Sequence, residues 1–338
     1  MHHRKLSLLL GAFLAHAAIS APAMAEQPGF LRIGTGGAGG TYFALGGSLA
    51  SALSAPPGAL ACDKGGPCGV PGLIAIAQAT TASVFNNAAV QNGELEAGMA
   101  SADVTSAMYK GTGTFEGKPH DKLRIVANLS PEFLHLVLPK GHELHGLDEL
   151  KGMRVGIAQP GSGTQVAVLK ILESRGIGRD DIKGAELNQA QSAERLADGQ
   201  LDAYFYTAGY PVAAMVQLAS TKGMELYSFP QDDLDKISTL VPGYLPNEIP
   251  ASTYPGVDYA VETPAVNALF IVSADLSDDM VYEVTKALWN ESTRKVLDNG
   301  HAAGKAIRLE TALAGIDTLG VPLHPGAERY YREIGLIK

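Results

Sequence analysis

A glycine-rich stretch at residues 32–47 contains the residue types best suited to hold an anion. Its seven glycines are Gly34, Gly36, Gly37, Gly39, Gly40, Gly46 and Gly47. The run before them predicts a strand and the run from Tyr42 to Leu53 predicts a helix, so they lie in a strand-to-helix turn. Glycine lets a ligand approach the main chain, and unpaired N–H groups at a helix start attract negative charge. Thr35 and Thr41 add two hydroxyl groups.

The same stretch fits the dinucleotide-binding pattern G-x-G-x-x-G at residues 34–39. That pattern requires an acidic residue about 20 positions later to bind the ribose. Between Gly40 and Lys64 the only acidic residue is Asp63, in a loop of cysteine, glycine and proline. A small-anion site is therefore favoured, with a purely structural turn as the alternative.

Residues 161–164, Gly-Ser-Gly-Thr, form a second predicted strand-to-helix turn. Other segments that end predicted strands supply Thr81, Ser83, Ser101, Asp103, Tyr206 and Tyr210. Ligands of open α/β sheets bind beyond the carboxyl ends of strands, so these side chains are expected to face one cleft. Alternatively, the hydroxyls cap helices and the tyrosines border the core. Asp103 could pair with a ligand amino group or hold its own turn.

Residues 1–25 predict a signal peptide. Arg4 and Lys5 precede an apolar run over Leu6–Ile19, and Ala23–Ala25 fits a cleavage site, so export to the periplasm is expected. Loss of the two basic residues changes the formal net charge from −9 to −11. Such an acidic protein is not expected to bind nucleic acid or anionic lipid.

The two cysteines, Cys62 and Cys68, are expected to form a disulfide in an oxidising compartment. The bridge would stiffen the loop between the first helix and the second strand, away from the ligand. No histidine or further cysteine lies nearby, so a metal site is not expected, and neither is a cofactor.

Alternating strand-like and helix-like segments predict an α/β fold with mostly parallel sheets. Two similar sets, with a late return to the first, predict two lobes joined by two crossovers. Residues 26–131 and 266–338 form lobe I, and residues 132–265 form lobe II. Hinge strands are expected near Phe133–Leu138 and Ala268–Ser273.

Two further predictions concern single elements. Leu123–Ala127 and Phe133–Leu138 are expected as successive strands, and Asp279–Leu297 as one helix. His135 lies inside the second of these strands, where a core histidine is expected.

Catalytic motifs are missing: the sequence contains no G-x-S-x-G, H-E-x-x-H or C-x-x-C. Binding rather than catalysis is therefore expected. The alternatives are a secreted α/β enzyme acting on a small carboxylic acid and a ligand-sensing partner of a membrane receptor.

Four segments carry a resemblance to a known family: Gly34–Tyr42, Gly161–Thr164, Phe205–Gly209 and Pro322–Tyr331. Together they resemble the TAXI family, the solute-binding subunits of tripartite ATP-independent periplasmic (TRAP) transporters. The resemblance implies a type II-like periplasmic-binding-protein fold, in which two hinge-linked, mostly parallel sheets enclose a ligand cleft. It implies capture of a small organic anion, such as glutamate, a dicarboxylate or a 2-oxo acid, and delivery to TRAP membrane permease subunits. A monomer is expected.

The sequence departs from the family at two places. Family members usually carry Ala-Gln-x-Asp followed by aromatics, whereas residues 100–103 read Ala-Ser-Ala-Asp without them, and Thr80–Val84 lacks the usual glycines. No arginine stands in the cleft motifs, so amides and hydroxyls are expected to hold the carboxylate, and Thr35→Ala or Ser162→Ala to weaken binding. The expected ligand-binding residues are Thr35, Gly36, Gly37, Gly39, Gly40, Thr41, Tyr42, Thr81, Ser83, Ser101, Asp103, Ser162, Gly163, Thr164, Tyr206 and Tyr210.

Overall fold

The computed structural model describes residues 29–338, so the expected signal peptide lies outside the described residues. The strands are β1 (Gly29–Gly34), β2 (Ser54–Ala55), β3 (Val70–Pro71), β4 (Leu73–Gln78), β5 (Ala97–Ser101), β6 (Leu123–Pro139), β7 (Arg154–Gly156), β8 (Lys183–Ala185), β9 (Ala203–Ala208), β10 (Met224–Leu226), β11 (Leu245–Ile249) and β12 (Val261–Ser273). The helices are α1 (Thr41–Leu53), α2 (Ser83–Gln91), α3 (Ala102–Lys110), α4 (Gly163–Ser174), α5 (Gln189–Ala197), α6 (Ala213–Thr221), α7 (Gln231–Leu240), α8 (Asp278–Leu288), α9 (Glu291–Gly300), α10 (Ile316–Leu319) and α11 (Pro325–Glu333). Within this range no helix has the length and apolar character needed to cross a membrane.

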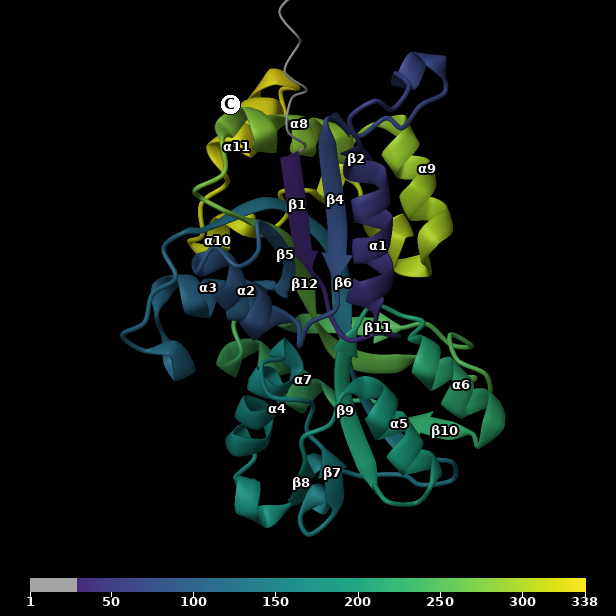
Figure 1. The fold of residues 1–338 in the computed structure, drawn as a ribbon. Helices are drawn as coiled ribbons and strands as arrows, with labels where there is room; N and C mark the ends of the chain where they lie inside the picture. The colour runs from purple at the N-terminus through teal and green to yellow at the C-terminus, as the bar shows by residue number, and fades with distance from the viewer. Residues whose placement is uncertain (1–28) are drawn as a thin grey trace, which may run out of the picture.

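The long strands β6 and β12 run between two halves of the molecule (Figure 1). One half contains β1, β4 and β5 with α1, α8, α9 and α11, and the other contains β7 to β9 with α4, α5 and α6. The main strand order is β4-β1-β5-β12-β6-β9-β7-β8, with β10 paired to β6 and β11 to β12. This is the two-lobed α/β fold that the sequence predicts.

The pairing of β6 differs from the expectation of two strands and two separate sheets. β6 continues through Pro131 as one strand, pairing with β12 up to Phe133 and with β9 from Phe133 onward. Proline is tolerated in a sheet at a bulge, and the register with β12 shifts between Asn267 and Leu269. Because β6 and β12 serve both lobes, ten of the twelve strands form one sheet, and β2 and β3 pair separately. In the large sheet β1 pairs in parallel with β4 and β5, and β7 pairs in parallel with β8 and β9, whereas every strand pairing of β6 and β12 is antiparallel.

The strand β5 shows why apolar residues fill both faces of lobe I. Ala97 and Met99 point into a core beneath α1, α8, α9 and α11, whereas Ala100 points into the core with α2 and α3. Successive side chains of a strand alternate between faces, so a strand covered by helices on both sides is apolar throughout.

The helix expected over Asp279–Leu297 is two helices, α8 and α9. Asn290 separates them, and its side chain accepts a hydrogen bond from the Thr293 amide at 2.7 Å, which begins α9. Asparagine is favoured at this capping position because its side chain satisfies an amide that has no partner within the helix.

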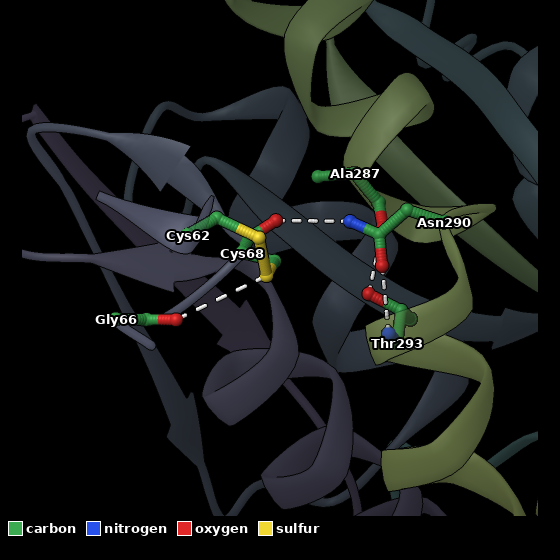
Figure 2. The surroundings of a disulfide bond; sticks show 6 residues. All are labelled: Cys62, Gly66, Cys68, Ala287, Asn290 and Thr293. Carbon is green, nitrogen blue, oxygen red and sulfur yellow. Dashed lines mark hydrogen bonds between the residues drawn. A yellow bond between two sulfur atoms is a disulfide. The ribbon is translucent and has the colours of Figure 1, made fainter. Parts of the chain in front are cut away.

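The disulfide between Cys62 and Cys68 is confirmed, with a Cα–Cα distance of 4.8 Å. Figure 2 shows that the bridged loop lies against the α8–α9 junction, where the Asn290 side-chain amide donates to the Cys68 carbonyl at 2.9 Å. The bridge therefore closes a loop of lobe I between β2 and β3, and the Asn290 hydrogen bond attaches that loop to the start of α9.

Replacing both cysteines by serine is expected to lower the free energy of unfolding by about 2 kcal/mol, because a short loop is no longer closed in the unfolded chain. Chemical denaturation measures this difference. Ligand affinity should stay the same, since no residue of the cavity described below comes from residues 54–72. Reductant gives a matched control, because these are the chain's two cysteines. A clear loss of affinity on reduction would contradict a purely structural role.

A candidate ligand-binding cavity between the lobes

A cavity of about 280 Å³ lies where the two lobes meet. Eleven of the sixteen expected ligand-binding residues line it: Gly36, Gly37, Thr41, Tyr42, Thr81, Ser83, Ser101, Ser162, Gly163, Thr164 and Tyr206. They come from both lobes and from segments far apart in the chain. The two glycine turns thus face each other across a single cavity.

Five helices begin at this cavity. Thr41 and Tyr42 start α1, Ser83 starts α2, and Ser101 is the residue before α3. In lobe II, α4 contributes its first residues, Gly163 and Thr164, and α5 contributes Gln189 and Ala190. The first amides of a helix have no acceptor within it, and its dipole favours negative charge at this end. The cavity is therefore suited to an anionic group.

The lobes touch each other directly around the cavity, so this structure represents the closed arrangement. Across the cleft, the carbonyl of Gly161 accepts hydrogen bonds from the amides of Val84 at 3.1 Å and Phe85 at 3.2 Å. The Thr41 hydroxyl donates to the carbonyl of Gly209 at 2.7 Å. Gly161 has a φ of +85°, a conformation that glycine adopts without strain.

Glu132 is the acidic residue of the cavity wall. Its side chain is buried, and the Tyr42 hydroxyl donates to its Oε2 at 2.5 Å. Burial in surroundings of low polarity raises the pKa of the Glu132 carboxyl to about 8, because the charged form is poorly solvated there. Near pH 7 this carboxyl is therefore mostly protonated in the ligand-free protein.

Five of the expected residues do not line the cavity. Thr35 is buried in lobe I, where its hydroxyl donates to the Gln78 carbonyl at 2.7 Å. Gly39 and Gly40 shape the turn behind the lining, and Tyr210 packs against Phe133 with ring centroids 4.7 Å apart. Asp103 is buried outside the lining, and burial raises the pKa of its carboxyl.

Several expected hydroxyls already have partners in the fold. The Ser162 hydroxyl donates to the Gln159 carbonyl at 2.7 Å and caps α4 by accepting from the Gln165 amide. The Thr164 hydroxyl accepts from the Thr207 amide at 3.1 Å. The first amides of α1, α4 and α5 are therefore more available to a ligand than these hydroxyls, and Thr35→Ala and Ser162→Ala would each remove a hydrogen bond within the fold.

Sequence reasoning missed twelve residues of the lining: Ala38, Ala82, Glu132, Ala158, Gln159, Leu187, Asn188, Gln189, Ala190, Thr207, Ala208 and Tyr244. Two of them carry a readable signal. Asn188 begins the pattern of a capping box, which marks the start of α5. Glu132 is the one acidic residue of β6, a mostly buried strand, and a buried acidic side chain often indicates a functional group.

His135 lies near this wall and is a core histidine, as the sequence suggests. Its Nε2 lies 2.9 Å from the Tyr254 hydroxyl, and its Nδ1 lies 2.9 Å from the Phe133 carbonyl. Burial lowers the pKa of the His135 imidazole to about 4. It is neutral near pH 7 and is fully used by the fold.

The fold is similar to that of several solved protein structures. PhnD1 from Prochlorococcus marinus, solved with methylphosphonate, aligns with a TM-score of 0.51 at 11% identity, covering 87% of this chain and 98% of that one. A protein from Bordetella bronchiseptica aligns with a TM-score of 0.50 at 17% identity, covering 90% and 82%. The alkanesulfonate-binding protein SsuA from Xanthomonas axonopodis pv. citri aligns with a TM-score of 0.45 at 19% identity, covering 91% and 85%. The first two alignments, with TM-scores of 0.51 and 0.50, show a shared fold.

The model of the NMT1-like family matches residues 33–335. The assignment to the TAXI family is therefore wrong, and the TRAP permease partner that it implied is withdrawn with it. The segments that suggested it are mostly strand-to-helix turns, which a two-lobed binding protein needs wherever a helix begins at its cleft. Such turns indicate the fold more than they identify a family. This chain belongs to the NMT1-like family.

Proposed function

We propose that this protein is a periplasmic solute-binding protein that captures a small organic ligand and delivers it to a membrane transporter. One observation carries the proposal: the starts of five helices and one buried carboxyl group meet in a cavity enclosed by two lobes. The predicted signal peptide over residues 1–25 supports export.

The cavity favours a ligand that carries both a carboxylate and an amino group. The helix starts offer donors to the carboxylate, and Glu132 offers an acceptor to an ammonium group. No arginine, lysine or histidine lines the cavity within the described residues. α-Amino acids, glutamate-like ones among them, are therefore the first candidates.

A 2-oxo acid or dicarboxylate is the second candidate. A protonated Glu132 can donate a hydrogen bond to a carboxylate, and its raised pKa favours that form. Two ligand charges without a cationic partner would nevertheless be costly in a buried cavity, which places this class second.

Thermal shift and calorimetry test the ligand class. An α-amino acid that fits should raise the melting temperature, because it binds only the folded protein. Near pH 7 its ammonium group favours ionised Glu132, so binding should release up to one proton. The binding heats in phosphate and Tris buffers would then differ in proportion to the proton released.

Other outcomes separate the alternatives. Stabilisation by a dicarboxylate without proton release would favour the second candidate. Stabilisation by sugars or simple cations, with no response to any carboxylate, would contradict the proposal.

We further propose binding without catalysis. Among residues 29–338, no histidine, cysteine or lysine lines the cavity to act as a base or nucleophile beside the ligand. Ligand recovered unchanged after long incubation would support this, and a converted product would identify an enzyme acting on a small acid. Tight ligand binding, without uptake of that ligand by cells that produce the protein, would favour a ligand-sensing partner of a membrane receptor.

A further inference from the structure

Gln189 is a polar residue of the cavity whose side-chain nitrogen has no hydrogen-bond partner within the described residues. It is the first residue of α5 and lines the cavity. Only 5% of the residue is exposed, and its Nε2 has no hydrogen-bond partner among residues 29–338. Buried amide groups are almost always paired, because an unpaired one is poorly solvated.

Capping of α5 does not explain this side chain. The Asn188 side chain accepts from the Gln191 amide at 2.9 Å, and the Gln191 side chain accepts from the Asn188 amide at 3.1 Å. This reciprocal pair completes the helix start. The amides of Gln189 and Ala190 remain in the first turn, where a helix offers no acceptor.

The opposite lobe encloses this region. Gly37 and Ala38 line the cavity there, and the Gln189 Oε1 lies 3.8 Å from the position that a Cβ on Gly39 would take. Leu187 adds an apolar wall beside the start of α5. The acidic residue of the lining, Glu132, lies on a different element, β6.

We infer that Gln189 and the first turn of α5 form a second recognition point for a terminal oxygen acceptor of the ligand, such as a carboxamide or carboxylate. This inference rests on the proposed function, since it concerns the same ligand. It makes Gln189 a specificity-determining residue: amino acids with an oxygen at the end of the side chain are preferred over methyl-terminated analogues.

Affinities for glutamine and norvaline test the preference, because the two amino acids have the same chain length but norvaline ends in a methyl group. Wild-type protein should prefer glutamine by tenfold or more, and Gln189→Ala should reduce this preference to below about threefold. The exposed Gln217→Ala on α6 is the matched control and should retain the full preference. A preference that survives Gln189→Ala would overturn the inference while leaving the proposed function intact.

A second measurement does not depend on the ligand. Gln189→Leu removes an unpaired buried amide while keeping similar volume, so the melting temperature of ligand-free protein should rise or stay unchanged. If Gln189→Leu lowers it, the amide is used by the fold and the inference fails. If neither amino acid binds wild-type protein while Gln189→Leu is stabilising, the amino-acid proposal fails and an unpaired recognition group remains at α5.

Discussion

Replacing Glu132 by glutamine is expected to stabilise the ligand-free protein by up to about 3 kcal/mol at pH 7. The folded carboxyl has a pKa of about 8, against an ordinary value of 4.5 in the unfolded chain. Between these values the unfolded chain is ionised and the folded protein holds a proton, so the carboxyl reduces stability increasingly as pH rises from 4.5 to 8. Glutamine has no proton to lose and can still accept from the Tyr42 hydroxyl.

The stability difference between Glu132→Gln and wild type should therefore be small below pH 4.5, grow up to pH 8 and then level off. Denaturation curves across this range measure it. Asp103, Tyr42 and Tyr206 lie around the carboxyl and are common to both proteins, so their titration largely cancels in the comparison. Glu262→Gln, at an exposed position of β12, is the matched control for replacing a glutamate by glutamine in a sheet. A variant less stable than wild type at pH 7 would show that the carboxylate is satisfied in the ligand-free fold.

The same substitution should weaken binding of an amino acid. A hydrogen bond between charged groups contributes roughly 1.5–3 kcal/mol, so the loss is expected to be roughly tenfold or more. Proton release on binding should disappear as well. Opposite effects on stability and affinity would mark Glu132 as a group whose burial is tolerated because it meets the ligand.

Substituting Gly163 by valine is expected to weaken ligand binding by roughly 10- to 100-fold through its effect on lobe closure. A Cβ at this position would lie 2.7 Å from the Ser101 Oγ and 3.1 Å from the Ser83 Cβ, both on lobe I. Overpacking of this kind costs about 1–3 kcal/mol, which the ligand must overcome whenever the lobes close. The measurement is the affinity of this variant for the amino acid that raises the melting temperature of wild type most.

The free energy of unfolding of ligand-free Gly163→Val should change little, because without ligand the variant can avoid the contact by separating the lobes. Gly47→Val is the matched control: it also places valine in a helix, and no atom lies within 4 Å of its Cβ position. It should bind ligand like wild type. Equal affinity of Gly163→Val and wild type would show that the ligand is bound without this close approach of the lobes.

The sequence alone was sufficient for the α/β class, the disulfide and the two turns that face the cavity. These features depend on local chemistry: glycine where a backbone must approach another surface, and apolar periodicity where a strand or helix is buried. The order of the turns along the chain also placed them at the carboxyl ends of strands, which meet at one edge of a parallel sheet. For this reason eleven expected residues line one cavity.

Only the tertiary structure decided which polar groups face that cavity. Thr35 and Ser162 have suitable chemistry, but their hydroxyls pair with nearby carbonyls in the fold. Glu132 and Gln189 gave only weak signals in the sequence, because their role depends on the two lobes enclosing them in one cavity. The continuity of β6 through Pro131 depends on its pairing with β12, a partner more than a hundred residues away in the chain. Burial and pairing between distant segments are properties of the folded chain, so local residue patterns cannot determine them.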